Sequence, residues 1–560
     1  MGKITKSSTA EYFAKNLQQV GFSSPTKAVL TTLKEAVDNS LDACEQAGIL
    51  PEIWVTIERL GAGSGRNTEK IKVMVQDNGP GIEGDDLAKV FGEYLASSKF
   101  GRGQCTRGQQ GIGISAATTW AQLTQAQGVI VTTRTERMRK AIQAQVDVDI
   151  KTNTGIVKNR VTLDADVPRG TKVEFVIDGR LQIHGDGGLL TYLEGTVLVN
   201  PHLTLHYQLP GMDPVSHIRV SQEVPRIPDA TLPHPHTYKL GEFITYAALF
   251  GRVSVAKFLK TGFSRITDSV LQQFVHNGLS PSFLERPLTS LKNEDFASLF
   301  KIIQETQLPA PSTKSVLTVG ESALSMSIQR LGEVDFFSVV TRKPTICDYK
   351  PVVVEVALAR FKNVKQDPED PVQVLRFANR VPLQFDKASC AITKAIESVN
   401  WRTYGLQQPK GSLPLGPYIF AVAVTSPFIK FKNASKETID ASDELVEEIR
   451  RALIQAGQKL SRYIRREQRE ADFLRKKAHI EQFAPILVDY LCQITKASPQ
   501  RRDRAYAGLQ RLLGRDQESL NDTNWDEPKK AEEGRLGAHG SSLSQKSQST
   551  TSRSTGTKER

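Results

Sequence analysis

Apolar residues recur along the first part of the chain with the spacings of both helices and strands. Over residues 28–47 they return every three or four positions, which predicts an amphipathic helix. Residues 52–60 and 70–76 predict two strands joined by a flexible, glycine-rich loop. Later strands are predicted at 128–133, 142–150 and 171–177. The pattern therefore indicates a mixed α and β domain at the start of the chain.

The pattern changes after a proline-rich joint at 224–235. Residues 236–306 are predicted to be helical throughout, and α/β patterning returns over 313–465. A helical stretch dense in Arg and Lys follows from 444 to about 513. The tail 516–560 has almost no apolar residues, so we expect it to be disordered.

Composition narrows the classes of function. The formal net charge of +12 favours a polyanionic partner, either nucleic acid or an anionic membrane surface. No run of about 18 apolar residues is present, so no membrane-spanning helix is expected. The five cysteines are far apart, which favours reduced thiols in a cytosolic protein over a zinc cluster or a disulfide framework.

Three segments of the first domain carry candidate chemistry. In the first, Glu35 and Asn39 are four residues apart and share one face of the predicted helix. Glu35 could polarise a water molecule for attack on a phosphate, and Asn39 could hold Mg²⁺ through its amide oxygen. Taken alone, the segment is more often the polar face of an amphipathic helix.

The second and third segments are rich in glycine. Asp77, in Gln76-Asp-Asn-Gly-Pro-Gly-Ile82, could accept a hydrogen bond from an exocyclic amine, while glycines let the backbone approach a ring closely. The third segment, Arg107-Gly-Gln-Gln-Gly-Ile-Gly-Ile-Ser115, runs into a predicted helix, where backbone amides can cradle phosphate. Each segment alone could be an ordinary turn.

In this order and spacing, the three segments resemble the nucleotide site of the Bergerat-fold ATPases, which include gyrase, heat-shock protein 90, sensor histidine kinases and MutL. The resemblance implies an ATP pocket with a mobile lid over residues 91–107, which contains Ser98 and Lys99. It also implies that Thr171 supports the contact to adenine.

Longer segments resemble one family more specifically, the B subunits of DNA topoisomerase VI. These segments are 10–16, 95–100, 107–115, 234–236, 258–265, 340–344, 375–383 and 400–405. The resemblance implies an α+β multidomain fold. Its expected parts are a Bergerat-fold α/β-sandwich ATPase domain with an N-terminal strap at 1–228, a helix-two-turn-helix domain at 229–308, an α/β transducer domain at 309–465, long C-terminal helices at 466–515 and a disordered tail at 516–560.

The resemblance also implies site residues. ATP and Mg²⁺ are the expected cofactors, and Asn39 is the expected metal ligand. A transducer lysine of this family reaches the γ-phosphate, and the match places that role on Lys432, with Lys436 second. Glu35 and Lys432 are then the catalytic residues. The implied nucleotide-binding residues are Asn39, Asp77, Gly81, Ser98, Lys99, Gly108, Gln109, Gln110, Gly111, Ile112, Gly113, Ile114, Ser115, Thr171, Lys432 and Lys436.

The implied function is that of the ATPase subunit of a type IIB DNA topoisomerase. Two B subunits would dimerise on ATP and close a gate on one DNA duplex, while two A subunits of an A₂B₂ heterotetramer cut the other for relaxation or decatenation. No membrane contact is expected, and the location would be the cytoplasm, on the nucleoid. Trp401, Arg402 and Tyr404 resemble a DNA-sensing element, but packed aromatics at a helix end explain them equally well.

Two other functions stay open. An ATP-gated DNA clamp or chaperone-like ATPase of the same superfamily would have no cleavage partner, and the helical insert at 236–306 argues against it. A DNA-bridging scaffold would bind ATP without hydrolysing it, and Glu35 argues against that because a pure binder needs no general base. The helices after 465 are expected to dock the A subunit, with coiled-coil self-association as the competing interpretation.

Overall fold

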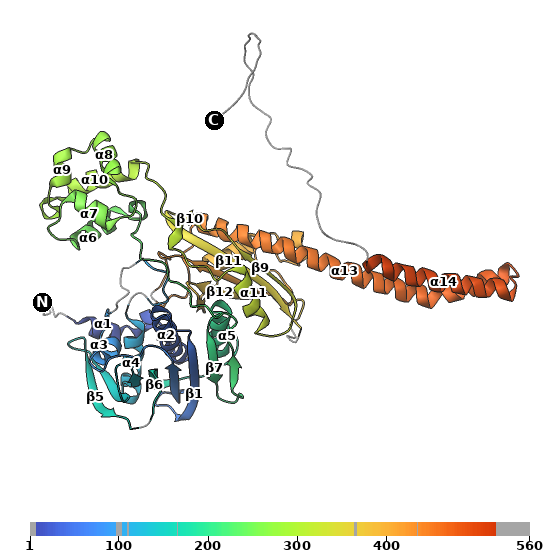
Figure 1. Ribbon diagram of the computed structural model, residues 1–560, viewed down its shortest axis with the longest axis horizontal. Helices are drawn as coiled ribbons and strands as arrows, with labels where there is room; N and C mark the ends of the chain where they lie inside the picture. Colours follow the sequence, from blue (N-terminus) through green and yellow to red (C-terminus); the bar gives the residue numbers. More distant parts are fainter. Residues whose placement is uncertain are drawn as a thin grey trace, which may run out of the picture. The chain divides into compact units, whose positions relative to one another are not determined.

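The computed structural model describes residues 7–96, 103–108, 111–164, 166–362, 367–433 and 435–521. Its contacts define two compact units, Met1–Glu467 and Gln468–Arg560. The first unit holds an N-terminal α/β lobe, a helical lobe and a second α/β lobe, each with a hydrophobic core (Figure 1). Within the described ranges, none of the helices combines the length and apolar character that crossing a membrane requires.

The N-terminal lobe is built on an eight-stranded sheet in the order β5-β4-β3-β6-β2-β1-β7-β8. Neighbouring strands are antiparallel except for the parallel pair β1 and β7. The strands are β1 (Glu52–Ala62), β2 (Glu69–Asp77), β3 (Val129–Arg134), β4 (Ile142–Asp149), β5 (Thr154–Thr162), β6 (Gly170–Gly179), β7 (Thr204–Gln208) and β8 (Val215–His217). The five strands predicted above are confirmed, whereas β5 and β8 were not predicted. The edge strand β5 is mostly exposed, so it carries little apolar alternation.

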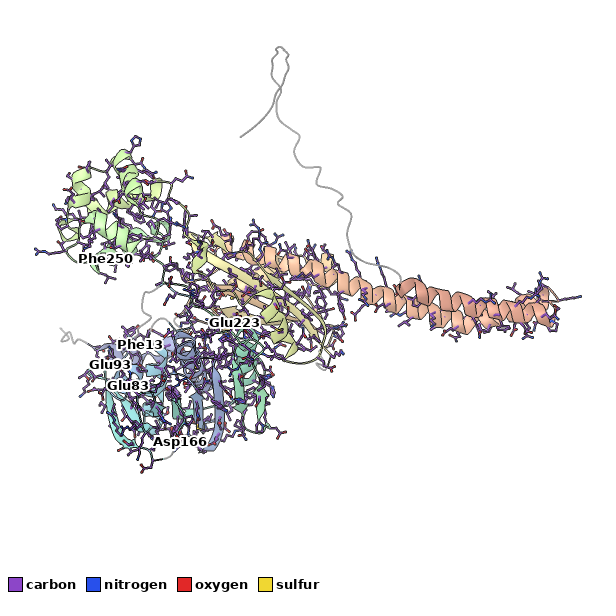
Figure 2. The ribbon with its side chains drawn as sticks, viewed as in Figure 1. Phe13, Glu83, Glu93, Asp166, Glu223 and Phe250 are labelled. Carbon is purple, nitrogen blue, oxygen red and sulfur yellow. The ribbon has the colours of Figure 1, made fainter. Side chains whose placement is uncertain are left out.

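The helices of this lobe are α1 (Thr9–Lys15), α2 (Pro25–Gln46), α3 (Leu87–Gly92), α4 (Gly113–Gln125) and α5 (Leu189–Val199). Helix α4 contacts both α2 and α3, and the three helices cover one face of the sheet (Figure 1). Helix α1 folds back onto the same lobe, where Phe13 stacks on Tyr94 with ring centroids 5.2 Å apart. Figure 2 labels Phe13 close to Glu93, the residue before that tyrosine. The N-terminal segment therefore packs on its own lobe in this state.

Helix α5 joins the two α/β lobes. Its sequence, Leu-Leu-Thr-Tyr-Leu-Glu-Gly-Thr-Val-Leu-Val, is apolar nearly all round, as expected of a helix buried on both sides. Leu189 and Leu193 lie in the core of the N-terminal lobe, whereas Leu198 and Val199 pack against the sheet of the second α/β lobe. Arg330 fastens the end of α5 by donating to the carbonyl groups of Asn200 (2.9 Å), Leu203 (3.1 Å), Ile218 (3.1 Å) and Val197. Helix α5 therefore packs into the cores of both α/β lobes.

The helical lobe has a core dominated by phenylalanine, including Phe243, Phe258, Phe263 and Phe274. Its helices are α6 (Leu240–Ala248), α7 (Val255–Gly262), α8 (Asp268–His276), α9 (Pro281–Glu285) and α10 (Asn293–Glu305). The prediction of an all-helical segment over 236–306 is confirmed.

The second α/β lobe contains a six-stranded sheet in the order β10-β11-β14-β12-β13, with β9 paired to β11. Its elements are α11 (Glu321–Gln329), β9 (Val334–Thr341), β10 (Thr345–Cys347), β11 (Lys350–Phe361), β12 (Gln373–Ala378), β13 (Val381–Leu383), α12 (Ala391–Ser398), β14 (Ile419–Thr425) and α13 (Asp443–Ile494). Helix α12 and the first part of α13 cover one face of this sheet, and α5 and α11 cover the other.

The second unit contains the end of α13 and helix α14 (Pro499–Asn521). The two helices form an antiparallel hairpin, in which Arg502 pairs with Asp489 at 2.6 Å and the Tyr506 hydroxyl donates to the Pro485 carbonyl at 3.3 Å (Figure 1). Helix α14 continues to Asn521, so the prediction of disorder from residue 516 is wrong over 516–521. The rest of that predicted tail lies outside the described residues.

Candidate active site

A cavity of about 400 Å³ opens in the N-terminal lobe between α2, α3 and the start of α4. The ends of strands β2 and β6 and a loop of the second α/β lobe complete its wall. The predicted site residues that line it are Glu35, Asn39, Asp77, Gly81, Gly108, Gly111, Ile112, Gly113, Ile114, Thr171 and Lys436. The three candidate segments of the sequence therefore meet in one place.

Helix α2 directs Glu35 and Asn39 into this cavity. The helix begins at Pro25, and the Ser24 hydroxyl caps it by accepting from the Lys27 amide at 3.2 Å. Its apolar residues, among them Leu33, Val37 and Leu41, are buried in the core of the lobe. The amphipathic pattern therefore leaves the polar face, with Glu35 and Asn39, toward the cavity.

Asp77, the last residue of β2, is buried and firmly oriented. Its Oδ2 accepts from the Ser40 hydroxyl at 2.7 Å, and its Oδ1 accepts from the amides of Gly79 at 2.9 Å and Thr171 at 3.1 Å. Burial raises the pKa of the Asp77 carboxyl, and these three hydrogen bonds oppose that shift. A carboxylate fixed in this way suits the recognition of an amine on a planar ring. Thr171 supports Asp77 through its backbone amide.

Glycine is required beside Asp77 and at the start of α4. Gly81 has φ +76°, and a Cβ there would lie 2.3 Å from the Arg134 carbonyl oxygen. At Gly113 a Cβ would lie 1.9 Å from Glu35 Oε2, so the Glu35 carboxylate lies directly against this residue. No described side chain caps this end of α4, so its first amides are available to an anion.

A loop of the second α/β lobe reaches the cavity through Lys436. The Lys436 Nζ donates to the Arg107 carbonyl oxygen at 2.9 Å, and its side chain lines the cavity wall. Lys436 has φ +54°, in the left-handed region. Lys432 lines a neighbouring cavity instead and is exposed. Lys436, which the sequence placed second to Lys432, is therefore the lysine that lines this cavity.

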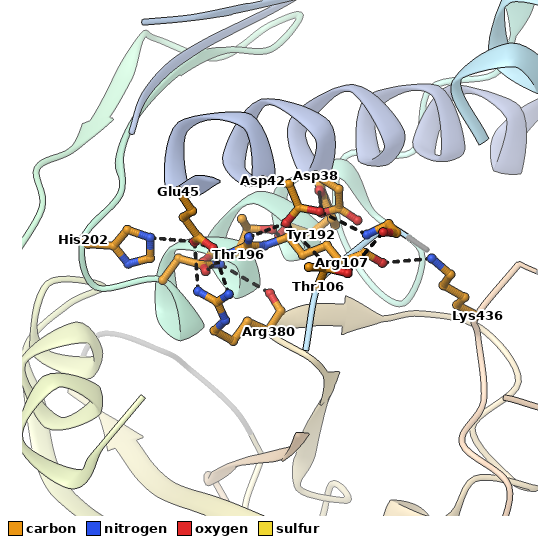
Figure 3. A network of polar contacts seen from close by, with 12 residues as sticks. Asp38, Asp42, Glu45, Thr106, Arg107, Tyr192, Thr196, His202, Arg380 and Lys436 are labelled. Carbon is orange, nitrogen blue, oxygen red and sulfur yellow. Dashed lines mark hydrogen bonds and ion pairs between the residues drawn. The ribbon is translucent and has the colours of Figure 1, made fainter. Parts of the chain in front are cut away.

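Behind Gly108, the Arg107 guanidinium is completely buried in a cluster of charges (Figure 3). Its Nη1 donates to Asp42 Oδ1 at 2.8 Å, and its Nη2 donates to Glu45 Oε1 at 2.7 Å. Asp42 and Glu45 both belong to α2. The glycine-rich segment is therefore anchored to the same helix that carries Glu35 and Asn39.

Glu45 also binds the second α/β lobe. Arg380, in the turn between β12 and β13, donates to both Glu45 carboxylate oxygens at 2.9 Å (Figure 3). His202 contacts Glu45 Oε1 at 2.8 Å. Burial alone would raise the pKa of the Glu45 carboxyl, but Arg107 and Arg380 hold it well below its usual range. One carboxylate thus joins the glycine-rich segment of one lobe to the sheet of the other.

Asp38, one turn from Glu35 on α2, is buried beneath the cavity. Burial raises the pKa of the Asp38 carboxyl to about 6, with Lys34 opposing the shift. The Tyr192 hydroxyl of α5 donates to Asp38 Oδ1 at 3.1 Å.

We expect Asp38→Asn to remove a pH dependence of stability. The folded-state pKa of about 6 exceeds the ordinary value of 3.8, so the folded protein binds more protons than the unfolded chain between these values. The wild-type free energy of unfolding should therefore fall as the pH rises from about 4 to about 6. The variant keeps an acceptor for Tyr192 but has no proton to bind. Urea denaturation over this range measures the effect, and equal slopes for both proteins would contradict it.

Some predicted residues lie elsewhere. Ser115 is buried in α4, where its hydroxyl donates to the Glu93 carbonyl at 2.9 Å rather than lining the cavity. Ser98, Lys99, Gln109 and Gln110 lie outside the described residues.

The predicted DNA-sensing trio divides between core and surface. Trp401 is fully buried, and its indole N–H donates to the Ile396 carbonyl at 2.8 Å. Tyr404 is half-buried and packs against Gly457 of α13. Arg402 is exposed, with its guanidinium on the Gln408 carbonyl at 2.7 Å. The two aromatics therefore pack as the second interpretation expects, and of the three side chains Arg402 alone is exposed.

Sequence reasoning missed Glu45 and Arg380 as members of the site. Arg380 falls in the segment 375–383 that carries the family resemblance, but no local pattern pairs it with Glu45. The two residues are 335 positions apart, so no spacing pattern within one helix or strand can relate them. Only the folded arrangement of the two lobes reveals the pair.

Comparisons with known proteins agree with this arrangement. Residues 311–476 match the family model described as Topoisomerase VI B subunit, transducer, and residues 26–180 match Histidine kinase-, DNA gyrase B-, and HSP90-like ATPase. The B subunit of type 2 DNA topoisomerase 6 from Archaeoglobus fulgidus is 34% identical over 514 residues, which cover 92% of this chain and 83% of that protein. The protein of the same name from Pyrococcus furiosus is 30% identical over 548 residues, covering 89% of this chain and 93% of its own. The ATPase region of Saccharomyces cerevisiae topoisomerase II is 11% identical at a TM-score of 0.37, over 83% of this chain and 98% of that one, too weak a likeness to carry an argument.

Proposed function

Because the chain belongs to the family of type 2 DNA topoisomerase 6 B subunits, we propose that it is the ATPase subunit of a type IIB DNA topoisomerase. It binds ATP in the cavity between α2 and α4 and hydrolyses it. The nucleotide cycle drives the passage of one DNA duplex through a double-strand break in another.

The residues of the cavity have distinct roles in this proposal. Glu35 takes a proton from the water that attacks the γ-phosphate, and Asp77 accepts a hydrogen bond from the adenine amino group. The amides at Gly113 hold phosphate oxygens through the uncapped end of α4.

Mg²⁺ would be held by the Asn39 amide oxygen, and its charge would offset that of the phosphates. In the part of the chain that the structure describes, no three His, Cys, Asp or Glu side chains gather as a metal site. The ion would therefore take its other ligands from phosphate and water, which is the usual arrangement for Mg²⁺ beside a nucleotide.

The observation that carries the proposal is the position of Lys436. It belongs to the second α/β lobe, the transducer, yet its ammonium lies at the cavity wall on the Arg107 carbonyl. A γ-phosphate there would offer Lys436 a stronger, charged acceptor, and that acceptor disappears on hydrolysis and release. ATP and ADP would therefore favour different placements of the transducer loop, which is the requirement for a nucleotide-driven movement. We accordingly place the γ-phosphate contact on Lys436 and not on Lys432, which lines a neighbouring cavity.

The proposed partners follow from the family. Two copies of the chain dimerise on ATP around a DNA duplex, and the domains divide at about residues 228, 308 and 465. The helices at 466–515 dock the A subunit of an A₂B₂ heterotetramer, and the assembly works in the cytoplasm on the nucleoid. Of the DNA-sensing trio, Arg402 is the residue that we propose to contact DNA in the present conformation.

Relaxation of supercoiled plasmid tests the proposal. The full chain, mixed with a topoisomerase VI A subunit, should relax the plasmid only when ATP is present. Lys436→Met should lose most of this activity because the transducer no longer senses the γ-phosphate. Lys394→Met, which changes an exposed lysine on α12, is the matched control and should keep it. Relaxation without ATP, or full activity of Lys436→Met, would contradict the proposal.

A further inference from the structure

A second cavity, of about 370 Å³, lies on the other side of the Arg107 peptide from the nucleotide cavity. We call it the rear cavity. Its walls come from the start of the glycine-rich segment, from the turn after β12, from residues 429–433 and from Lys436, and they include Thr106, Asn379, Lys430 and Lys432. The rear cavity therefore forms between the ATPase lobe and the transducer.

The rear cavity is positively charged. No Asp or Glu belongs to its described lining, whereas Lys430, Lys432 and Lys436 do. Lys430 and Lys432 are exposed. Asp386 lies within electrostatic reach of Lys432 outside this lining, and its carboxylate already accepts hydrogen bonds from Ser389 and Thr438. In contrast, carboxylates of Glu35 and Asp77 line the nucleotide cavity. An anion leaving the nucleotide cavity would therefore find more favourable charge at the rear.

Among the described residues, the Lys436 side chain and the peptide between Arg107 and Gly108 lie at the boundary of the two cavities. Lys436 lines both, and its Nζ bridges to the Arg107 carbonyl at 2.9 Å. Arg107 lines only the rear cavity and Gly108 only the nucleotide cavity, so the partition follows the peptide between these two residues. The bond from Lys436 to a neutral carbonyl is weaker than one to a phosphate oxygen, so a phosphate beside it can replace the carbonyl.

We propose that the rear cavity receives the inorganic phosphate that ATP hydrolysis produces, and that Lys432 is the cation that receives it. The inference rests on the proposed function, because it needs a phosphate to be formed at Glu35. Lys436 moves with the phosphate as the phosphate separates from ADP. Its hydrogen bond to the Arg107 carbonyl then breaks, and the partition between the two cavities opens. Phosphate then passes to Lys432 and leaves through the rear cavity, so its departure is coupled to the transducer loop that carries both lysines.

Single-turnover kinetics on the full chain test this route. Hydrolysis is measured by acid quench, and phosphate release by a fluorescent phosphate-binding protein added in excess. In Lys432→Gln we expect an unchanged rate of hydrolysis and phosphate release slowed by about fivefold, the effect of removing one partly screened charge. Lys394→Gln, on an exposed lysine of α12 outside both cavities, should release phosphate at the wild-type rate.

Each outcome has one meaning. If Lys432→Gln releases phosphate at the wild-type rate, the exit route is overturned and the proposed function stays intact. A slower hydrolysis step in Lys432→Gln also overturns it, because Lys432 would then act on the nucleotide itself. If the wild-type chain forms no phosphate under conditions that bind ATP, the proposed function fails, and the exit route fails with it.

Discussion

Glu35→Ala should reduce ATP hydrolysis by about 10²- to 10⁴-fold while ATP still binds. The carboxylate lies against Gly113 at the start of α4, where phosphates would be held, and it lines the cavity beside Asn39. Removing it takes away the base for the attacking water but leaves Asp77 and the amides of α4 in place. Hydrolysis is measured by phosphate production, and binding by the fluorescence of a labelled ATP analogue.

Two variants make this result specific. Glu35→Gln keeps the shape of the side chain and should be as inactive as the alanine variant, because the amide cannot accept a proton in the same way. Glu58→Ala, which changes an exposed carboxylate on β1, should hydrolyse ATP at the wild-type rate. Hydrolysis by Glu35→Ala within about threefold of wild type would show that another group acts as the base.

Glu45→Gln should lower the free energy of unfolding by about 3–5 kcal/mol, the usual effect of breaking a buried ion pair from one side. Arg380 would lose a carboxylate that it contacts with two nitrogens, and Arg107 would lose one of the two carboxylates to which it donates, keeping Asp42. The substitution is nearly isosteric, so lost packing contributes little. Urea denaturation at pH 7 measures the change.

The difference between Glu45→Gln and wild type should also depend on pH. The folded-state pKa of Glu45 lies well below its ordinary value of 4.5, so the carboxylate contributes its full stabilisation above that value. This contribution is lost as the pH falls through the depressed folded-state pKa. The two proteins should therefore converge in acid. A difference below about 0.5 kcal/mol at pH 7 would show that the cluster does not hold the lobes together.

Local patterns were sufficient for much of the fold. The period of apolar residues in α2 and the alternation in β1 and β2 predicted these elements to within a few residues. Helix α5 was missed because its apolar residues surround it, and a helix buried on both sides has no polar face to reveal its period. Its function as a joint between two lobes is a property of tertiary packing.

In the candidate site, too, some features could be predicted from the sequence and others depend on tertiary packing. Glu35 and Asn39 share a helical face, and Asp77 ends a strand, but each segment alone has an ordinary structural explanation. The resemblance to the Bergerat-fold ATPases placed them in one pocket, and the structure brings them together. Lys432 and Lys436 could not be separated from the sequence, because only the folded loop shows that Lys436 lines the nucleotide cavity and Lys432 does not. Trp401 was ambiguous for a similar reason, since only the core of the transducer shows that it is buried.

We expect nucleotide in the cavity to change how copies of this chain assemble. Sedimentation velocity of the full chain, with and without a non-hydrolysable ATP analogue and Mg²⁺, tests it most directly. We predict monomers without the analogue, dimers with it, no dimers for Asn39→Ala, and dimers for Glu35→Ala. A chain that binds the analogue and yet stays monomeric would contradict the account.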